Sequence, residues 1–284
     1  MRLDEFESVF RSAVRPRFTF VPPHLGRVMI VNHLDPEANV RCGEAVQQLL
    51  ASLPGTSSFE LVTAEFSDWN TAAGLLARVE EVSPDLVVTW RNLKGAVEAS
   101  PWDLGEVVHA LSQGCEVPLL LLPDPRREDA ASRVAPPSRV LLVTDHLTGD
   151  DRLVNWGVAL TPPQGHLHLA HVEDEAVFSH YMDAISRLPA FDTEQARTLL
   201  LEKLLALPQA YCESLRAELA EHHIDEHVIS LVQLGNPIAL YPSLVEKHRI
   251  DLLVCNTKDP TQRAMGALAH ALAVELRDLP LLLL

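Results

Sequence analysis

Four short patterns occur twice in this 284-residue chain, in the same order. The paired segments are Arg27–Val31 with Arg139–Val143, Asp85–Val88 with Asp251–Val254, Gly105–Leu111 with Gly266–Leu272, and Pro118–Leu122 with Pro280–Leu284. Self-similarity in a fixed order indicates a repeated structural unit. The chain is therefore predicted to hold two related halves, and an account of its function has to explain both halves and their differences.

Short β-rich runs alternate with longer helical stretches in both halves. Strands are predicted near 28–32, 59–66, 85–89 and 117–122, and at 139–145, 167–172, 227–234, 251–255 and 280–284. Strict alternation predicts an α/β fold with a parallel sheet covered on both faces. The offset between the halves grows from 112 to 166 residues between the first and the Asp-led strands. The first half should therefore lack one strand and one long helix, which we assign to the counterpart of residues 166–222.

The same patterns divide the chain into four segments. They are an N-terminal arm at 1–26, a truncated domain at 27–123, a linker at 124–138 and a complete domain at 139–284. The arm places Leu3, Phe6, Phe10 and Val14 on one helical face, which suits either packing across the two halves or binding of a partner.

The composition narrows the classes of function. A formal charge of −16, without a basic run, disfavours nucleic acid and membrane surfaces as partners. The acidic N-terminal segment does not resemble a signal peptide, and no apolar run is long enough to cross a bilayer, so we expect a cytoplasmic protein. The four widely spaced cysteines favour reduced, buried thiols.

The second half resembles a universal stress protein domain. The motifs that carry the resemblance are Leu141–Asp145, Leu167–Val172, Gly235–Pro237, Asp251–Val254 and the stretch from Gly266 to Pro280–Leu283. With a looser match over 27–123, the chain resembles the two-domain universal stress proteins of bacteria. The resemblance implies two tandem open parallel sheets of the adenine nucleotide alpha hydrolase-like type. It also implies that the last strands of the two halves pair antiparallel about a two-fold axis, so that one chain forms a pseudo-dimer.

Many members of that family hold ATP at the carboxyl ends of the strands, on a Gly-x-x-Gly, nine residues, then Gly-Ser or Gly-Thr pattern. Here Asn256 and Asp259 stand at the first two glycine positions, only six residues separate Asp259 from Gly266, and Ala267 replaces the hydroxyl residue. A carboxylate close to phosphate in a shielded site repels it by several kcal/mol. The ATP-binding motif of the second half is therefore predicted to be degenerate.

The first half departs further from the pattern. Trp90 and Leu93 stand at its glycine positions, and His33 takes the place of Asp145. By resemblance, the residues that could still contact a ligand are Thr144, Asp145, Val172, Gly235, Asn256, Thr257 and Gly266. Several also have a purely structural explanation, because Asp145 suits a helix N-cap and the glycines suit turns and close packing.

No sequence pattern of a catalytic site is present, since the chain lacks Gly-x-Ser-x-Gly, Walker, Gly-x-Gly-x-x-Gly and His-Glu-x-x-His motifs. We therefore expect a non-enzymatic role in stress response through ligand or protein binding, with no cofactor and no resident metal. The partners would be proteins of unknown identity or a second copy in a homo-oligomer. Two alternatives remain open. One is an ATP-binding sensor that uses only the second domain, and the other is a metal-binding protein that uses histidines such as His166, His168, His222, His223 and His227.

Overall fold

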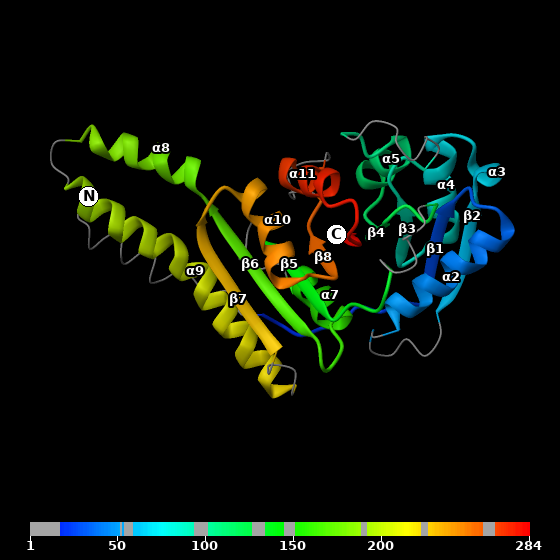
Figure 1. The fold of residues 1–284 in the computed structure, drawn as a ribbon, viewed down its shortest axis with the longest axis horizontal. Helices are drawn as coiled ribbons and strands as arrows, with labels where there is room; N and C mark the ends of the chain where they lie inside the picture. The colour runs from blue at the N-terminus through cyan, green and yellow to red at the C-terminus, as the bar shows by residue number, and fades with distance from the viewer. Residues whose placement is uncertain are drawn as a thin grey trace.

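Nine strands form one continuous sheet in the part of the chain that the structure describes. The computed structural model describes residues 18–51, 53, 59–93, 102–126, 134–144, 151–188, 192–222, 227–257 and 265–284. The strands are β1 (Arg27–Asn32), β2 (Glu60–Glu65), β3 (Leu86–Trp90), β4 (Leu119–Leu122), β5 (Arg139–Thr144), β6 (His166–Asp174), β7 (Val228–Gly235), β8 (Leu252–Cys255) and β9 (Leu281–Leu283). Their order is β2-β1-β3-β4-β9-β8-β5-β6-β7 (Figure 1). All nine predicted strands are present, and the mixed α/β fold is confirmed.

Neighbouring strands are parallel except at the centre of the sheet. There β4 and β9 pair antiparallel, with Leu120 opposite Leu282 and the flanking leucines opposite one another. This is the antiparallel pairing that the resemblance to the family implied for these two apolar strands. Each strand thereby gives the other a partner, so neither is left as an uncovered apolar edge.

Helices cover both faces of the sheet. They are α2 (Pro36–Leu50), α3 (Phe66–Trp69), α4 (Ala72–Val82), α5 (Glu106–Gly114), α7 (Asp151–Leu160), α8 (Glu175–Ser186), α9 (Thr193–Glu221), α10 (Pro237–His248) and α11 (Ala267–Glu275). Local sequence explains several starts, because Asp35, Asp192 and Asn236 each accept a hydrogen bond from a first-turn N–H group. Figure 1 shows α8 and the first half of α9 projecting beyond the sheet.

The strand without a counterpart in the first half is β7, which corrects the sequence assignment. We expected the missing part to correspond to residues 166–222, which include β6. In the structure β2 lies beside β1 as β6 lies beside β5, and the sheet ends at β2 on that side. Length differences locate a deletion only roughly, and which strand is missing is decided by pairing in the sheet.

The repeated Asp-led segments have the same structural role in both halves. Asp85 accepts hydrogen bonds from the N–H groups of Gly26 and Arg27 at the start of β1. Asp251 does the same for Ser138 and Arg139 at the start of β5. Each aspartate therefore ties the entry of one strand to that of its neighbour, which explains why the pattern recurs.

The described end of the N-terminal arm, which leads into β1 of the first half, packs against the second half. The Thr19 N–H donates to Asp151, and Thr19 and Val21 both bond the side chain of Asn155 in α7. Phe18 is buried. The helix predicted around residues 3–14 lies outside the described residues. None of the four cysteines, all of which lie among the described residues, is in a disulfide; Cys42, Cys212 and Cys255 are buried as predicted, whereas Cys115 is half-buried. Burial raises the pKa of Cys42 to about 11.

Candidate functional site

Most of the predicted ligand residues lie at the carboxyl ends of β5, β6, β7 and β8. These ends form one side of the sheet, its carboxyl-terminal edge. Thr144 ends β5 opposite His171, one residue before Val172 in β6. Gly235 ends β7 opposite Asp174, and Asn256 follows the last residue of β8. In open parallel sheets this edge is where ligands bind. Asp145 and Asp259 lie outside the described residues.

The backbone of Val172, which the resemblance placed against a nucleotide base, already has a protein partner. Its N–H donates to the hydroxyl oxygen of Tyr241 at 3.2 Å, and that hydroxyl lies 3.5 Å from the carbonyl of Ala170. Tyr241 lies in α10 and is almost fully buried. A buried tyrosine hydroxyl needs a partner, and this one uses the end of β6.

The loop after β8 is likewise bonded within the chain. The N–H and hydroxyl of Thr257 donate to the carbonyl oxygen of Leu284 at 2.7 and 2.6 Å. The Gly266 N–H donates to the carbonyl of Thr257 at 2.7 Å. Thr257 is buried, and Gly266 precedes α11 as an N-cap without a side-chain hydrogen bond. These donors hold the loop to the end of β9 and to the start of α11.

Gly235 is explained by packing. A Cβ atom at this position would lie 2.3 Å from a methyl group of Leu240 in α10. The glycine therefore lets the first turn of α10 approach the end of β7. The position supports the turn predicted from Gly235-Asn236-Pro237, in which Asn236 caps the helix.

Large side chains fill the corresponding edge of the first half. Trp90 and Leu93, which the resemblance aligns with the family's glycines, are buried, and the Trp90 ring lies 6.1 Å from the ring of His33. Burial, and then the nearby charge of Arg126, lower the pKa of His33. Trp90 and Leu93 therefore belong to the apolar core.

Four histidines lie in a row at the opposite, amino-terminal edge of β6 and β7. Successive ring centroids are separated by 5.1 Å from His227 to His166, 6.4 Å from His166 to His168, and 5.0 Å from His168 to His248. His168 Nδ1 and His248 Nε2 are buried without a hydrogen-bond partner. Burial, followed by the neighbouring His248, lowers the pKa of His168 to about 4. His168 is therefore neutral near pH 7.

The histidines do not form a metal site in the arrangement seen here. Within the described ranges, no group of three or more His, Cys, Asp or Glu side chains is placed to hold a metal ion. His223, one of the histidines considered from the sequence, lies outside those ranges. The ring of His222 instead lies 4.8 Å from the ring of Phe20 in the arm, tilted by 50°.

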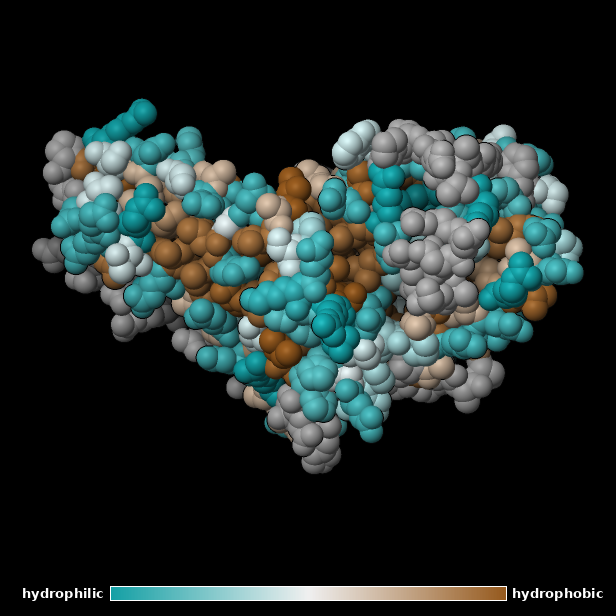
Figure 2. All heavy atoms as spheres, in the orientation of Figure 1, coloured by the Kyte–Doolittle hydropathy of each residue, from teal (hydrophilic) through white to brown (hydrophobic). Residues whose placement is uncertain are grey.

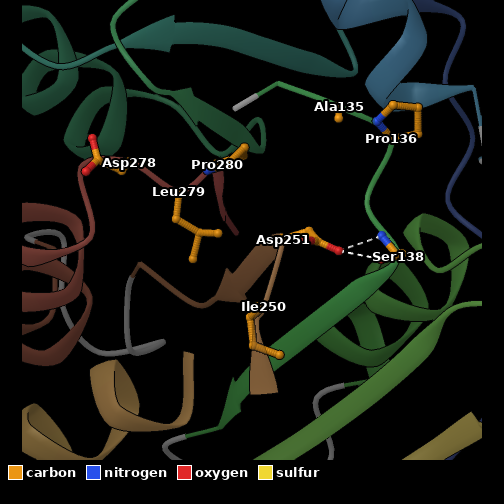
Figure 3. Close-up of a pocket in the computed structure, with 8 residues that line it drawn as sticks. All are labelled: Ala135, Pro136, Ser138, Ile250, Asp251, Asp278, Leu279 and Pro280. Atoms are coloured by element: carbon orange, nitrogen blue, oxygen red, sulfur yellow. Dashed lines mark hydrogen bonds between the residues drawn. The ribbon is translucent and has the colours of Figure 1, made fainter. Parts of the chain in front are cut away.

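Two pockets lie away from the predicted ligand residues. One, of about 380 Å³, is at the amino-terminal edge, where Asp251 accepts hydrogen bonds from Ser138 (Figure 3). The other, of about 530 Å³, lies between α10 and α11 beside Trp102. Neither pocket includes any of the seven ligand residues predicted from the sequence.

Two important residues escaped the sequence analysis. The hydroxyl of Tyr241 accepts a hydrogen bond from the Val172 N–H. The side chain of Arg91, which follows β3, contacts the carboxyl end of α11. The Arg91 guanidinium donates to the carbonyls of Ala273 and Leu276, and it is buried. Neither residue belongs to a repeated pattern, and no local signal points to their distant partners.

No protein-family model matches the chain, and no curated protein matches it in sequence. Solved structures do share its fold. The functionally unknown protein PA1789 from Pseudomonas aeruginosa PAO1 is 13% identical, with a TM-score of 0.52 over 92% of this chain and 93% of that one. A universal stress protein from Archaeoglobus fulgidus DSM 4304 is 12% identical, with a TM-score of 0.49 over 90% and 86%. At 13% identity, the likeness to PA1789 establishes the fold and nothing about function.

Among the described residues, no helix is both long enough and apolar enough to span a membrane.

Proposed function

We propose that this chain is a tandem universal stress protein whose nucleotide sites have degenerated. It would act in stress response by binding a ligand or a protein, without catalytic turnover. The proposal draws on the motifs of the second half, on the shared fold, and on the state of the edge where a nucleotide would bind.

The symmetry of the central strand pair supports the tandem part of the proposal. Leu120 and Leu282 hold equivalent places in the two Pro-Leu-Leu-Leu-Leu segments, and they face each other in the sheet. His109 and His270, equivalent in the repeated helical segments, stack with their rings 6.0 Å apart and 18° from parallel. Contact between equivalent residues is the property of a two-fold interface. These contacts support the proposal that the two halves form a pseudo-dimer within one chain.

One observation carries the proposal that the nucleotide site is degenerate. The backbone N–H groups at the carboxyl ends of the strands already donate hydrogen bonds within the chain. A phosphate-binding loop needs N–H groups that are free to meet the ligand. Here the N–H groups of Val172, Thr257 and Gly266 donate to Tyr241, Leu284 and Thr257. A nucleotide would have to break these bonds, and each buried group left unpaired costs about 1 to 3 kcal/mol.

Calorimetric titration of the purified chain with ATP, with and without Mg²⁺, tests this directly. We expect no saturable heat at millimolar ATP. Saturable binding that is lost in Asp145→Ala, but kept in Asp35→Ala, would overturn the degenerate-site reading and favour the sensor that uses only the second domain. Asp35 is a suitable control because its carboxylate caps α2 after the first strand of the other half. A mass measurement on the same preparation would identify any small molecule that co-purifies.

A further inference from the structure

The two outer edges of the sheet differ in how they are protected against pairing. Among the described residues, β2 and β7 are the terminal strands. β2 begins with Glu60 and ends with Glu65, and both are exposed. β7 reads Val-Ile-Ser-Leu-Val-Gln-Leu-Gly, without a charge or a proline over eight residues. Charges and prolines are the usual devices that keep an edge strand from pairing with another chain, so only β2 carries such protection in its own sequence.

One face of β7 also remains half open. Ile229 is in register with His168, which lies against His248 of α10, so Ile229, Leu231 and Gln233 face the side of the sheet that carries α10. All three are only half-buried. On the other side α9 packs against β7. The open face is therefore the one that bears Leu231 at the middle of the strand.

Exposed apolar side chains also occur on the helices that follow β6 and β7. Val177 and Tyr181 of α8 are 43% and 49% exposed, and Ile238 at the start of α10 is 59% exposed. Figure 2 shows apolar side chains gathered over the region where β6, β7 and α10 lie. Contiguous exposed apolar surface on a folded protein marks an interaction site.

Among the described residues, the side chain that bonds the backbone of this edge does so at its first residue. Arg216 of α9 donates to the carbonyl of Val228 at 2.6 Å. The strand from Ile229 onward spans about 23 Å at 3.3 Å per residue, enough for a full strand pair. An added strand would thus find a regular, uncharged template beyond Val228.

We propose that β7 pairs antiparallel with β7 of a second copy of this chain, about a two-fold axis at Leu231. The absence of charge from β7 favours this occupant, because two copies of the strand then oppose no like charges. With Leu231 opposite its own copy, Ile229 meets Gln233 and Ser230 meets Val232. Residues of one face therefore meet residues of the same face, and no like charges are opposed. The interface is isologous and closes at two chains.

Light scattering coupled to size-exclusion chromatography of the full chain tests the proposal. The wild type should have twice the chain mass of 31.4 kDa at micromolar concentration. Leu231→Lys and Leu231→Glu, which oppose like charges at the axis, should each be monomeric with an unchanged circular dichroism spectrum. An equimolar mixture of the two variants should recover the dimer, because in a mixed dimer the Lys of one chain faces the Glu of the other at the axis. Thr63→Lys, the matched change at the middle of β2, should remain dimeric.

Two results would overturn the proposal. A monomeric wild type shows that the edge is unpaired or that it receives a segment of a different protein. A dimer that survives both Leu231 variants shows that the copies associate through another surface. If a Leu231 variant fails to fold, Gln233→Lys places the charge at a side chain that is already polar and should give the same monomer.

Discussion

Replacing Arg91 tests whether the two halves are held together by more than the central strand pair. Arg91 follows β3 of the first half, yet its guanidinium caps the carboxyl end of α11 in the second half. It donates to Ala273, to Leu276 at 3.0 Å and to Arg277 at 3.5 Å. Burial, and then the charge of Arg277, lower its pKa to about 10, so it is still a cation at neutral pH. A cation at this end of a helix is favourable because it faces the unpaired carbonyls and the negative end of the dipole.

The size of the effect follows from the bonds that are lost. A hydrogen bond from a charged donor contributes about 1.5 to 3 kcal/mol, and two of the three are short enough to count in full. Removing the buried cation returns part of this energy, because its desolvation penalty disappears. We therefore expect Arg91→Met to lower the free energy of unfolding by about 3 kcal/mol. At a urea dependence of about 3 kcal/mol per M, the midpoint falls by about 1 M.

Urea unfolding followed by circular dichroism measures this shift. Arg91→Lys should recover only part of the loss, because a lysine keeps the charge but lacks the planar fork of donors. Arg41→Met provides the surface control. The Arg41 side chain is 68% exposed and its ion pair with Glu37 is 3.9 Å long, so the change should stay within about 0.5 kcal/mol. If Arg91→Met leaves the midpoint where it is in the wild type, the cap does not stabilise the contact between the halves.

Three further predictions concern the second half. His168 has a folded-state pKa of about 4, below its ordinary value of 6.5, so the unfolded state binds more protons than the folded state between these pH values. The free energy of unfolding should therefore be highest above pH 6.5 and fall by about 3 kcal/mol toward pH 4. Urea midpoints measured against pH should show this slope in the wild type and lose most of it in His168→Leu. Gly157→Ala should lower the free energy of unfolding by about 2 kcal/mol, because the added Cβ would lie 2.3 Å from Leu142 in the core. Thermal unfolding measures this loss, and an unchanged melting temperature would show that the Leu142 side chain can move aside. Tyr241→Phe should cost about 1 kcal/mol by freeing the Val172 N–H and should increase amide exchange at that residue, whereas unchanged exchange would mean that the hydroxyl does not protect it.

Most of the fold could be predicted because its signals are local. Short apolar runs such as Arg139–Thr144 and Leu252–Cys255 identify buried parallel strands, and the repeated Asp-led pattern ties adjacent strands in both halves. The antiparallel pairing of β4 with β9 could also be predicted. It required the resemblance to a family in addition to the apolar pattern of the two segments.

The candidate site could be predicted only in part. Thr144, Val172, Gly235 and Asn256 come to one edge, as parallel topology requires of residues at strand ends. What their backbone groups bind was not visible, because Tyr241 lies 69 residues from Val172. The missing strand was also assigned to the wrong position, since a difference in length does not say which strand lies at the edge.

The sequence by itself determined the strands and their alternation with helices, because each depends on residues close together in the chain. The two related halves and the degenerate phosphate-binding loop are predictions from the sequence and from its resemblance to a family. Only the tertiary structure decided that nine strands form one sheet, that β7 is an unprotected edge, and that Arg91 caps a helix 182 residues away. The physical reason is that hydrogen bonds and buried charges between distant segments depend on how the elements pack. No periodic pattern in the sequence records those contacts.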